Sequence, residues 1–233
     1  ALPDDPESRA LALNHLGWIA VMEQDEPSSI PWFRASAEAH AARGHEGRID
    51  QLMILADVAS FEKRQDDVEA YLDEALELVR DPPRLYLLPY LLERRAYLAL
   101  ARNQLDAAHR AATAFLECPG MSYEKVSRAQ TLLGSIEMRQ GRWRVAYRRF
   151  LEAAQPRAIP ESPLERSFIY AGLLATASHL NERAPIEGWV RSLEIAIPDP
   201  PARHPTARYL IEQAAAHLGR VQALRCRQLV EEL

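Results

Sequence analysis

The sequence predicts an all-α fold, a right-handed superhelical solenoid of antiparallel helix pairs. Strand-like alternation of β-branched residues is nearly absent from the 233 residues, in which Ala, Leu, Arg and Glu dominate. Prolines cluster between the candidate helices, where a missing N–H does not interrupt a helical hydrogen-bond ladder. A set of small and large apolar residues also recurs along the chain, and such recurrence is typical of stacked helical hairpins.

The repeat is clearest in two stretches that begin with a Leu-Gly pair, Leu16-Gly17 and Leu133-Gly134. Extending their register gives a glycine slot occupied by Gly17, Ala56, Ala96, Gly134 and Ala175. Next come a small slot with Ser29, Val68, Ala108, Ala146 and Ile186, and a large slot with Phe33, Leu72, Ala112, Phe150 and Val190. A last slot holds Ser36, Ala75, Phe115, Ala153 and Leu193. Small residues let two antiparallel helices approach, and large residues fill the groove between them.

We expect a single array of twelve helices in six hairpins, with approximate bounds 8–45, 46–83, 84–120, 121–160, 161–200 and 201–233. In the first hairpin, Ser28 is expected to cap a helix that has Pro31 in its first turn. In the third, Pro89 is expected to start or kink the first helix. In the fourth, Gly141 is expected to take the left-handed conformation between the helices. The sixth hairpin, the poorest match, is expected to turn at Gly219.

These features resemble the tetratricopeptide repeat superfamily. The residues that carry the resemblance are Leu16, Gly17, Ala20, Ser29 and Phe33, then Leu55, Ala56, Ala59, Val68, Leu72 and Ala75, then Leu133, Gly134, Ala146, Phe150 and Ala153. The repeats are about five residues longer than the family's usual length of about 34. Repeats of this length resemble those of the helical sensor domains of large bacterial transcriptional activators.

The resemblance implies that the first helix of each hairpin lines a concave groove. The groove residues that it implies are Asn14, Trp18, Val21, Asp50, Met53, Asp57, Tyr90, Glu93, Tyr97, Arg128, Thr131 and Met138. Amphipathic aromatic side chains are favoured at interfaces, and an acidic, aromatic groove would prefer a basic and apolar partner. The alternative interpretation is that superhelical curvature buries part of this surface against the next hairpin.

Composition and charge exclude several classes of protein. A formal net charge of −5 argues against direct binding to nucleic acid. No segment approaches the roughly eighteen apolar residues of a membrane span, and the acidic start lacks a signal-peptide pattern. We therefore expect a cytoplasmic protein, in which Cys118 and Cys226 are free thiols. Lys63 and Lys125 are its only lysines, a usage that suggests a G+C-rich bacterial genome.

The sequence contains no motif that indicates catalysis, a cofactor or a metal site. His40 and His45 form the closest histidine pair, but no third ligand stands near them. A histidine at a helix end is explained by the helix dipole. The pair Asp66-Asp67 is expected at a helix start, where negative charge is favourable. Trp143 is expected to anchor the packing between neighbouring hairpins.

The favoured function is a protein–protein interaction module that binds a peptide or a helix in its groove, as a regulatory or scaffold domain. The alternative is a small-molecule sensor domain of a bacterial transcriptional regulator, with Trp18, Tyr90 or Tyr97 stacking on the ligand. An enzyme has the least support. The oligomeric state stays open, because the last hairpin can either cap the array or form an interface.

Overall fold

All the secondary structure in the described part of the chain is helical. The computed structural model describes residues 3–22, 26–79, 82–157, 160, 162–180, 188–189 and 192. Its α-helices are α1 Pro6–Met22, α2 Glu26–Ala41, α3 Arg48–Phe61, α4 Gln65–Leu78, α5 Leu88–Ala101, α6 Leu105–Leu116, α7 Tyr123–Arg139, α8 Trp143–Ala153 and α9 Pro163–His179. Two short 3₁₀ helices, η1 Gly44–Gly47 and η2 Pro82–Leu87, precede α3 and α5. The described residues contain no strand, which confirms the all-α prediction for them. No helix in these ranges combines the length and apolarity needed to cross a membrane.

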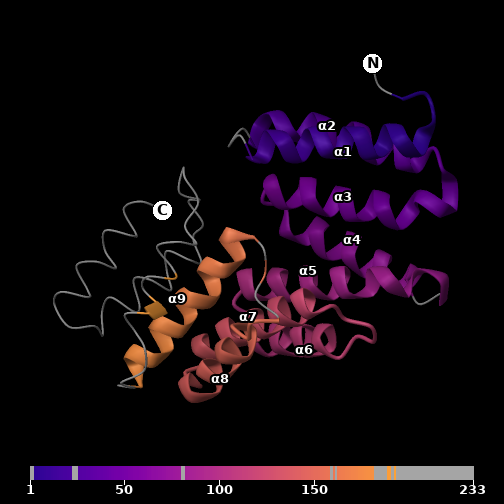
Figure 1. Ribbon diagram of the computed structural model, residues 1–233. Helices are drawn as coiled ribbons and strands as arrows, with labels where there is room; N and C mark the ends of the chain where they lie inside the picture. Colours follow the sequence, from indigo (N-terminus) through magenta and orange to yellow (C-terminus); the bar gives the residue numbers. More distant parts are fainter. Residues whose placement is uncertain are drawn as a thin grey trace. The chain divides into compact units, whose positions relative to one another are not determined.

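The chain divides into two compact units, an N-terminal unit Ala1–Arg102 and a C-terminal unit Asn103–Leu233. In the N-terminal unit each helix from α1 to α4 packs against the next helix in the sequence (Figure 1). In the C-terminal unit α7 packs against α6 and α8, and α9 packs against α7 and α8. The boundary falls inside the expected third hairpin, and one continuous array of six hairpins stays a prediction. Ile186, Val190, Leu193 and the hairpin 201–233 lie outside the described residues.

The residues of the recurring slots form the interior of the hairpins. Every slot residue in the described ranges is buried, which confirms the sequence register. A Cβ atom built on Gly17 would lie 2.6 Å from Cε1 of Phe33, closer than real Cβ contacts. Phenylalanine in the large slot therefore requires glycine in the glycine slot. In the second hairpin, Ala56 shares a core cluster with the smaller Leu72.

The turns inside the hairpins repeat one backbone conformation. Lys63, Asn103 and Gly141 have φ values of 58°, 57° and 75°. They stand 40 and 38 residues apart, the same intervals that separate the glycine slots of their hairpins. After α3, the N–H of Arg64 donates to the Ala59 carbonyl at 2.8 Å, which closes the helix end in a Schellman-type turn. The predicted left-handed conformation of Gly141 is confirmed.

Proline also marks the start of α5. Pro89 lies in the first turn of this helix, which begins at Leu88 immediately after the 3₁₀ segment η2. The prediction that Pro89 starts the helix is therefore confirmed. The first-turn position suits proline because its missing N–H has no helical acceptor there.

The prediction for the start of α2 is wrong. This helix begins at Glu26, so Ser28 lies within it and Pro31 lies beyond its first turn. Pro27 accounts for the earlier start, because its ring holds φ near the helical value and the first turn needs no N–H from it.

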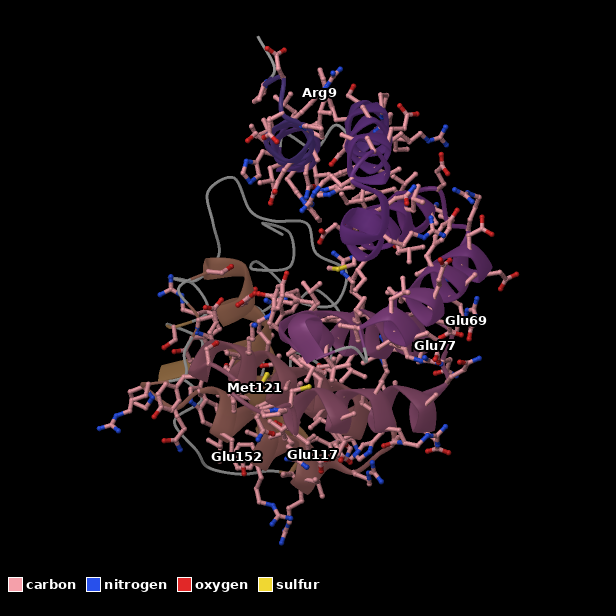
Figure 2. The ribbon with its side chains drawn as sticks, turned by 90° about the vertical axis from the view of Figure 1, so that its right-hand side faces the viewer. Arg9, Glu69, Glu77, Glu117, Met121 and Glu152 are labelled. Carbon is pink, nitrogen blue, oxygen red and sulfur yellow. The ribbon has the colours of Figure 1, made fainter. Side chains whose placement is uncertain are left out.

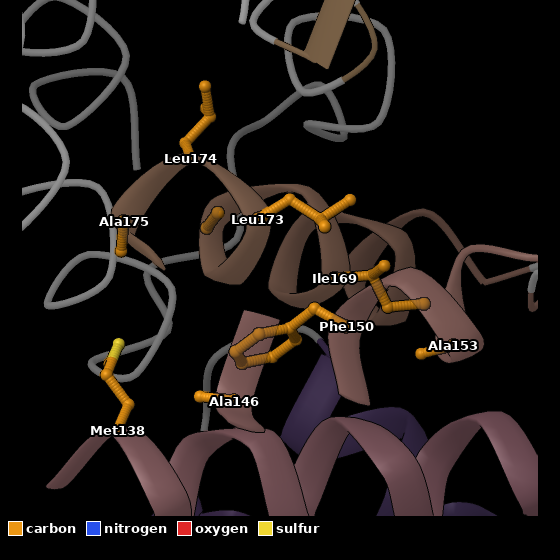
Figure 3. Packing of buried hydrophobic residues seen from close by; sticks show 9 residues of the cluster. Met138, Ala146, Phe150, Ala153, Ile169, Leu173, Leu174 and Ala175 are labelled. Carbon is orange, nitrogen blue, oxygen red and sulfur yellow. The ribbon is translucent and has the colours of Figure 1, made fainter. Parts of the chain in front are cut away.

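Phe150 lies in the core of the C-terminal unit. Its ring is fully buried in a cluster with Met138 of α7 and Ile169 of α9 (Figure 3). Cβ atoms on Gly134 of α7 and on Gly172 of α9 would both overlap this ring. The phenylalanine therefore limits the residue size on both helices. Helices α8 and α9 also contact each other at the start of α8, where Trp143 stacks on His179 of α9 with ring centroids 3.8 Å apart. This stacking confirms that Trp143 anchors one hairpin on the next.

The outer side of both units is rich in charged side chains. Figure 2 shows Glu69 and Glu77 on α4, and Glu117 and Glu152 in the C-terminal unit, with their carboxylates away from the apolar core. Arg102 pairs with two acidic side chains of α4, at 2.7 Å from Asp66 and 2.5 Å from Glu69. As predicted, Asp66 and Asp67 lie in the first turn of α4.

Candidate functional site

A hollow of about 320 Å³ in the N-terminal unit lies against the first helices of three successive hairpins. We call it the N-terminal hollow; it is lined by Glu7, Leu11, Asn14, Trp18, His40, Arg43, Asp50, Met53, Ile54, Asp57, Tyr86 and Arg94. Five of the predicted groove residues are among them: Asn14, Trp18, Asp50, Met53 and Asp57. Helical periodicity explains why α3 contributes so many, since residues three, four and seven apart share one face.

Two arginines face the carboxylates of the hollow. Arg94 of α5 donates two hydrogen bonds to the Asp57 carboxylate, one of them 3.0 Å long. Arg43 lies 3.5 Å from carboxylate oxygens of both Asp50 and Glu7. Three carboxylates and two guanidinium groups leave one negative charge among the lining residues. The predicted acidic groove is therefore largely neutralised by side chains that the sequence analysis did not assign to it.

The surroundings of His40 favour its uncharged form. Burial lowers the pKa of His40, and the nearby Arg43 guanidinium lowers it further against the opposing effect of Asp50. The His40 Nδ1 lies 3.2 Å from a guanidinium nitrogen of Arg43, so it accepts this hydrogen bond in the neutral form. His40 does lie in the last turn of α2, as expected, but its lowered pKa weakens the charge on which an interaction with the helix dipole depends.

The apolar part of the hollow is built on an aromatic cluster. Trp18 packs edge-on against Phe33 with ring centroids 5.3 Å apart, and Phe33 stacks on Phe61. The Trp18 indole is nevertheless partly exposed to solvent. Nearby, Oδ1 of Asn14 is buried and has no hydrogen-bond partner among the described residues. The hollow can thus offer an apolar surface to a bound group.

The other predicted residues of the N-terminal unit have different environments. Tyr90 and Tyr97 are exposed on α5 but do not line the hollow. Val21 packs beside the core cluster that contains Phe33. Glu93 is buried, so it does not belong to an exposed groove surface.

Of the predicted groove residues of the C-terminal unit, Met138 is buried, whereas Arg128 and Thr131 are half-buried. Met138 is buried in the core with Phe150, and the Thr131 hydroxyl donates to the Ser127 carbonyl at 2.8 Å. Arg128 lies 3.5 Å from a carboxylate oxygen of Glu165. Burial raises the pKa of Glu165 despite this arginine. The burial of Met138 follows from the packing of α8 and α9 over this part of α7.

Sequence reasoning did not identify the arginines of the hollow. Arg94 stands four residues after Tyr90 and three before Tyr97, so helical spacing alone would have placed it on the same face of α5. Arg43 follows the end of α2 in a turn, for which periodicity gives no direction. Its position depends on the tertiary packing of α1, α2 and α3.

A second polar cluster lies in the C-terminal unit around Glu137. Its carboxylate is almost fully buried, receives a hydrogen bond from Nε2 of His109 at 2.9 Å and pairs with Arg142. These partners belong to α6 and to the turn before α8. The cluster therefore ties three successive segments together and needs no ligand to explain it.

No protein-family model matches the chain, and no curated protein matches it. Among the described residues, no three His, Cys, Asp or Glu side chains are grouped so that they could hold a metal ion. The fold defines an all-α protein of packed helical hairpins with a hollow in its N-terminal unit.

Proposed function

We propose that the chain is a protein–protein interaction module of the tetratricopeptide type, whose hairpins stack into a right-handed solenoid. The observation that carries the proposal is that side chains of α1, α3 and α5 line one hollow. A concave site built from several repeats is the usual binding surface of helical arrays. The proposal assigns no catalysis to the chain and places it in the bacterial cytoplasm, in a regulatory or scaffold role.

The partner that suits the hollow is an apolar peptide segment with a basic residue. Trp18 and Met53 offer apolar surface, and amphipathic aromatics are common anchors at interfaces. The surplus negative charge of the lining favours a cation, although the pairing of Asp57 with Arg94 weakens that preference. The expected partner therefore binds mainly through apolar contact.

Selection of displayed peptides on the immobilised intact chain tests this function. We expect enriched peptides with apolar residues and a lysine or arginine, and at least tenfold weaker binding to a chain with Trp18→Ala and Met53→Ala. The matched control is Tyr123→Ala, an exposed aromatic of α7 outside the hollow. Circular dichroism verifies that each variant keeps its helicity. Equal losses for the control and the double variant would exclude the hollow as the binding site.

A small-molecule sensor is the second candidate, favoured by the size of the hollow. Its volume of about 320 Å³ lies at the lower end of the range of small-ligand pockets. A thermal-shift screen of metabolites distinguishes the two functions. Stabilisation by a single compound, lost in Trp18→Ala, supports the sensor, whereas enriched peptides without such a compound support the interaction module.

A further inference from the structure

Three side chains of the N-terminal hollow, those of His40, Arg43 and Asp50, meet at one point of its wall. The Nδ1 atom of His40 lies 3.2 Å from Nη1 of Arg43 and 3.9 Å from Oδ2 of Asp50. The same Nη1 and Oδ2 atoms lie 3.5 Å apart. A base, a cation and an anion therefore stand at the corners of one small triangle. We call these three residues the His40 triangle.

The backbone holds two corners of this triangle in place. His40 lies in the last turn of α2 and is only 3% exposed. Its carbonyl oxygen accepts a hydrogen bond of 3.0 Å from the backbone N–H of Arg43. A Cβ atom on Gly47 would lie 2.0 Å from the same oxygen, so the 3₁₀ segment η1 packs directly on it. A change in the charge of His40 must therefore be met by the surrounding side chains.

The charged groups that face His40 come from α1, from the turn after α2 and from α3. Glu7 of α1 and Asp50 of α3 favour the protonated imidazole, whereas Arg43 in the turn opposes it. Arg43 also lies 3.5 Å from a carboxylate oxygen of Glu7, so its guanidinium group bridges the two carboxylates. Among the residues whose side chains the structure describes, these three supply the charges that act on His40. Burial has the largest effect and lowers the pKa of His40.

Protonation of His40 reverses the hydrogen bonding within the triangle. In the neutral imidazole the proton is on Nε2, and Nδ1 accepts a hydrogen bond from Arg43. A proton taken up from solvent at Nδ1 turns this acceptor into a donor and places two cations side by side. Oδ2 of Asp50 is the neighbouring acceptor, and its side chain is exposed enough to turn toward the imidazolium. Asp50 then leaves Arg43, which keeps only the exposed Glu7.

Asp50 is also a carboxylate of the hollow that a basic partner can reach. The Asp57 side chain is only 13% exposed and accepts two hydrogen bonds from Arg94. The Asp50 side chain is 36% exposed, and its contact with Arg43 is longer, at 3.5 Å. A shift of Asp50 to the imidazolium therefore withdraws an acceptor that a lysine or arginine of the partner could use.

We propose that the His40 triangle is a pH-sensitive switch, in which protonation of His40 moves Asp50 from Arg43 to the imidazolium and releases a basic partner from the hollow. The lining has one surplus negative charge while His40 is neutral and none once His40 is protonated. Acid therefore removes the electrostatic attraction for a cation together with one of its acceptors. The release of a partner rests on the proposed function, whereas the exchange within the triangle does not.

Titration of the imidazole signals by NMR, in the intact chain without a partner, tests the exchange. Asp50→Asn should lower the pKa of His40, because it removes the carboxylate that receives the imidazolium. Arg43→Gln should raise the pKa of His40, because it removes the opposing cation. The matched control is the ion pair of Asp73 and Arg95, which does not line the hollow. Asp73→Asn and Arg95→Gln should leave the pKa of His40 unchanged.

Acid elution of displayed peptides tests the release of a partner. Peptides selected at pH 7.5 on the immobilised intact chain are washed at pH 5.0, and the bound fraction is compared with that at pH 7.5. The wild-type chain should lose about fivefold or more of its bound peptides. His40→Asn should lose less than twofold, because its amide oxygen accepts from Arg43 without taking up a proton. His15→Asn removes an exposed histidine outside the hollow and should behave as the wild type.

The switch is overturned if the pKa of His40 in Asp50→Asn and Arg43→Gln equals that in the two control variants. It is also overturned if the wild-type chain and His40→Asn release the peptides alike at pH 5.0. Circular dichroism verifies the fold of each variant, and the titration decides the exchange even where His40→Asn does not fold. A selection that enriches no peptide at pH 7.5 contradicts the proposed function, and the imidazole titration alone then decides the switch.

Discussion

Gly134 on α7 faces the ring of Phe150 on α8 with no space for a methyl group between them. A Cβ atom on Gly134 would lie 2.9 Å from Cζ of Phe150. Gly17 and Phe33 have the same relationship in the first hairpin. The two residues of each pair therefore share one volume, and neither is independent of the other.

Gly134→Ala should destabilise the C-terminal unit by about 1–3 kcal/mol, because the added methyl group overpacks the interface of α7 and α8. Adding Phe150→Leu should recover part of this loss, since leucine is the residue that accompanies alanine in the second hairpin. Urea unfolding of both single variants and the double variant measures the coupling. Strict additivity of the two changes would contradict the shared volume.

Phe150→Ala should destabilise the fold by about 3–5 kcal/mol, as expected for a fully buried aromatic residue. Arg148→Ala, on the exposed side of the same helix, should change the free energy of unfolding by less than about 0.5 kcal/mol. Denaturant midpoints of the two variants provide the measurement. Similar losses at both positions would show that the helix register is wrong.

Lys63→Gly should stabilise the N-terminal unit by about 0.5–1 kcal/mol. The left-handed conformation of Lys63 is costly for a residue with a Cβ atom and free of cost for glycine. The reciprocal change, Gly141→Ala, should destabilise the other unit by about 1 kcal/mol. Both values follow from thermal or urea unfolding, and destabilisation by Lys63→Gly would show that its side chain contributes more than its backbone costs.

Acidification should destabilise the N-terminal unit through His40. Burial lowers the pKa of His40 in the folded chain. On acidification the unfolded chain therefore protonates this imidazole at a higher pH than the folded chain does. Stability is therefore fully retained above the ordinary histidine pKa of about 6.5 and falls as the pH drops below it. The loss between pH 7 and pH 5 should be smaller in His40→Gln. An unchanged pH dependence of the urea midpoint in this variant would rule out His40 as its source.

Glu137→Ala should cost the C-terminal unit about 1.5–3 kcal/mol, because it removes a buried carboxylate that is hydrogen-bonded to His109 and paired with Arg142. Glu152→Ala, an exposed carboxylate on the neighbouring helix, provides the control. The free energy of unfolding in urea should fall only for the buried residue. Equal small effects would mean that the cluster contributes nothing to stability.

The interior of the hairpins could be predicted from sequence because it depends on local periodicity and on residue size. Gly134 and Phe150 recur at fixed spacings, and such spacings determine which side chains face each other. The N-terminal hollow could be predicted only in part. Trp18 and Asp57 follow from the repeat register, whereas Arg43 stands in a turn and approaches Asp50 through tertiary packing.

Two kinds of error have identifiable physical causes. Met138 was assigned to a groove by its position on a first helix, but the packing of α8 and α9 buries it. Ser28 has the side chain of a helix cap, yet Pro27 allows α2 to begin earlier. In both cases a local preference was overridden, by neighbouring helices for Met138 and by an adjacent proline for Ser28.

The division of the chain at Arg102 affects how each stability measurement is interpreted. Trp18 and Trp32 belong to the N-terminal unit, while Trp143 and Trp189 belong to the C-terminal unit. If the two units unfold at different denaturant concentrations, total tryptophan fluorescence mixes two transitions and a single midpoint has no thermodynamic meaning. In a chain with Trp143→Phe and Trp189→Phe, tryptophan fluorescence reports on the N-terminal unit alone. The opposite pair of substitutions reports on the other.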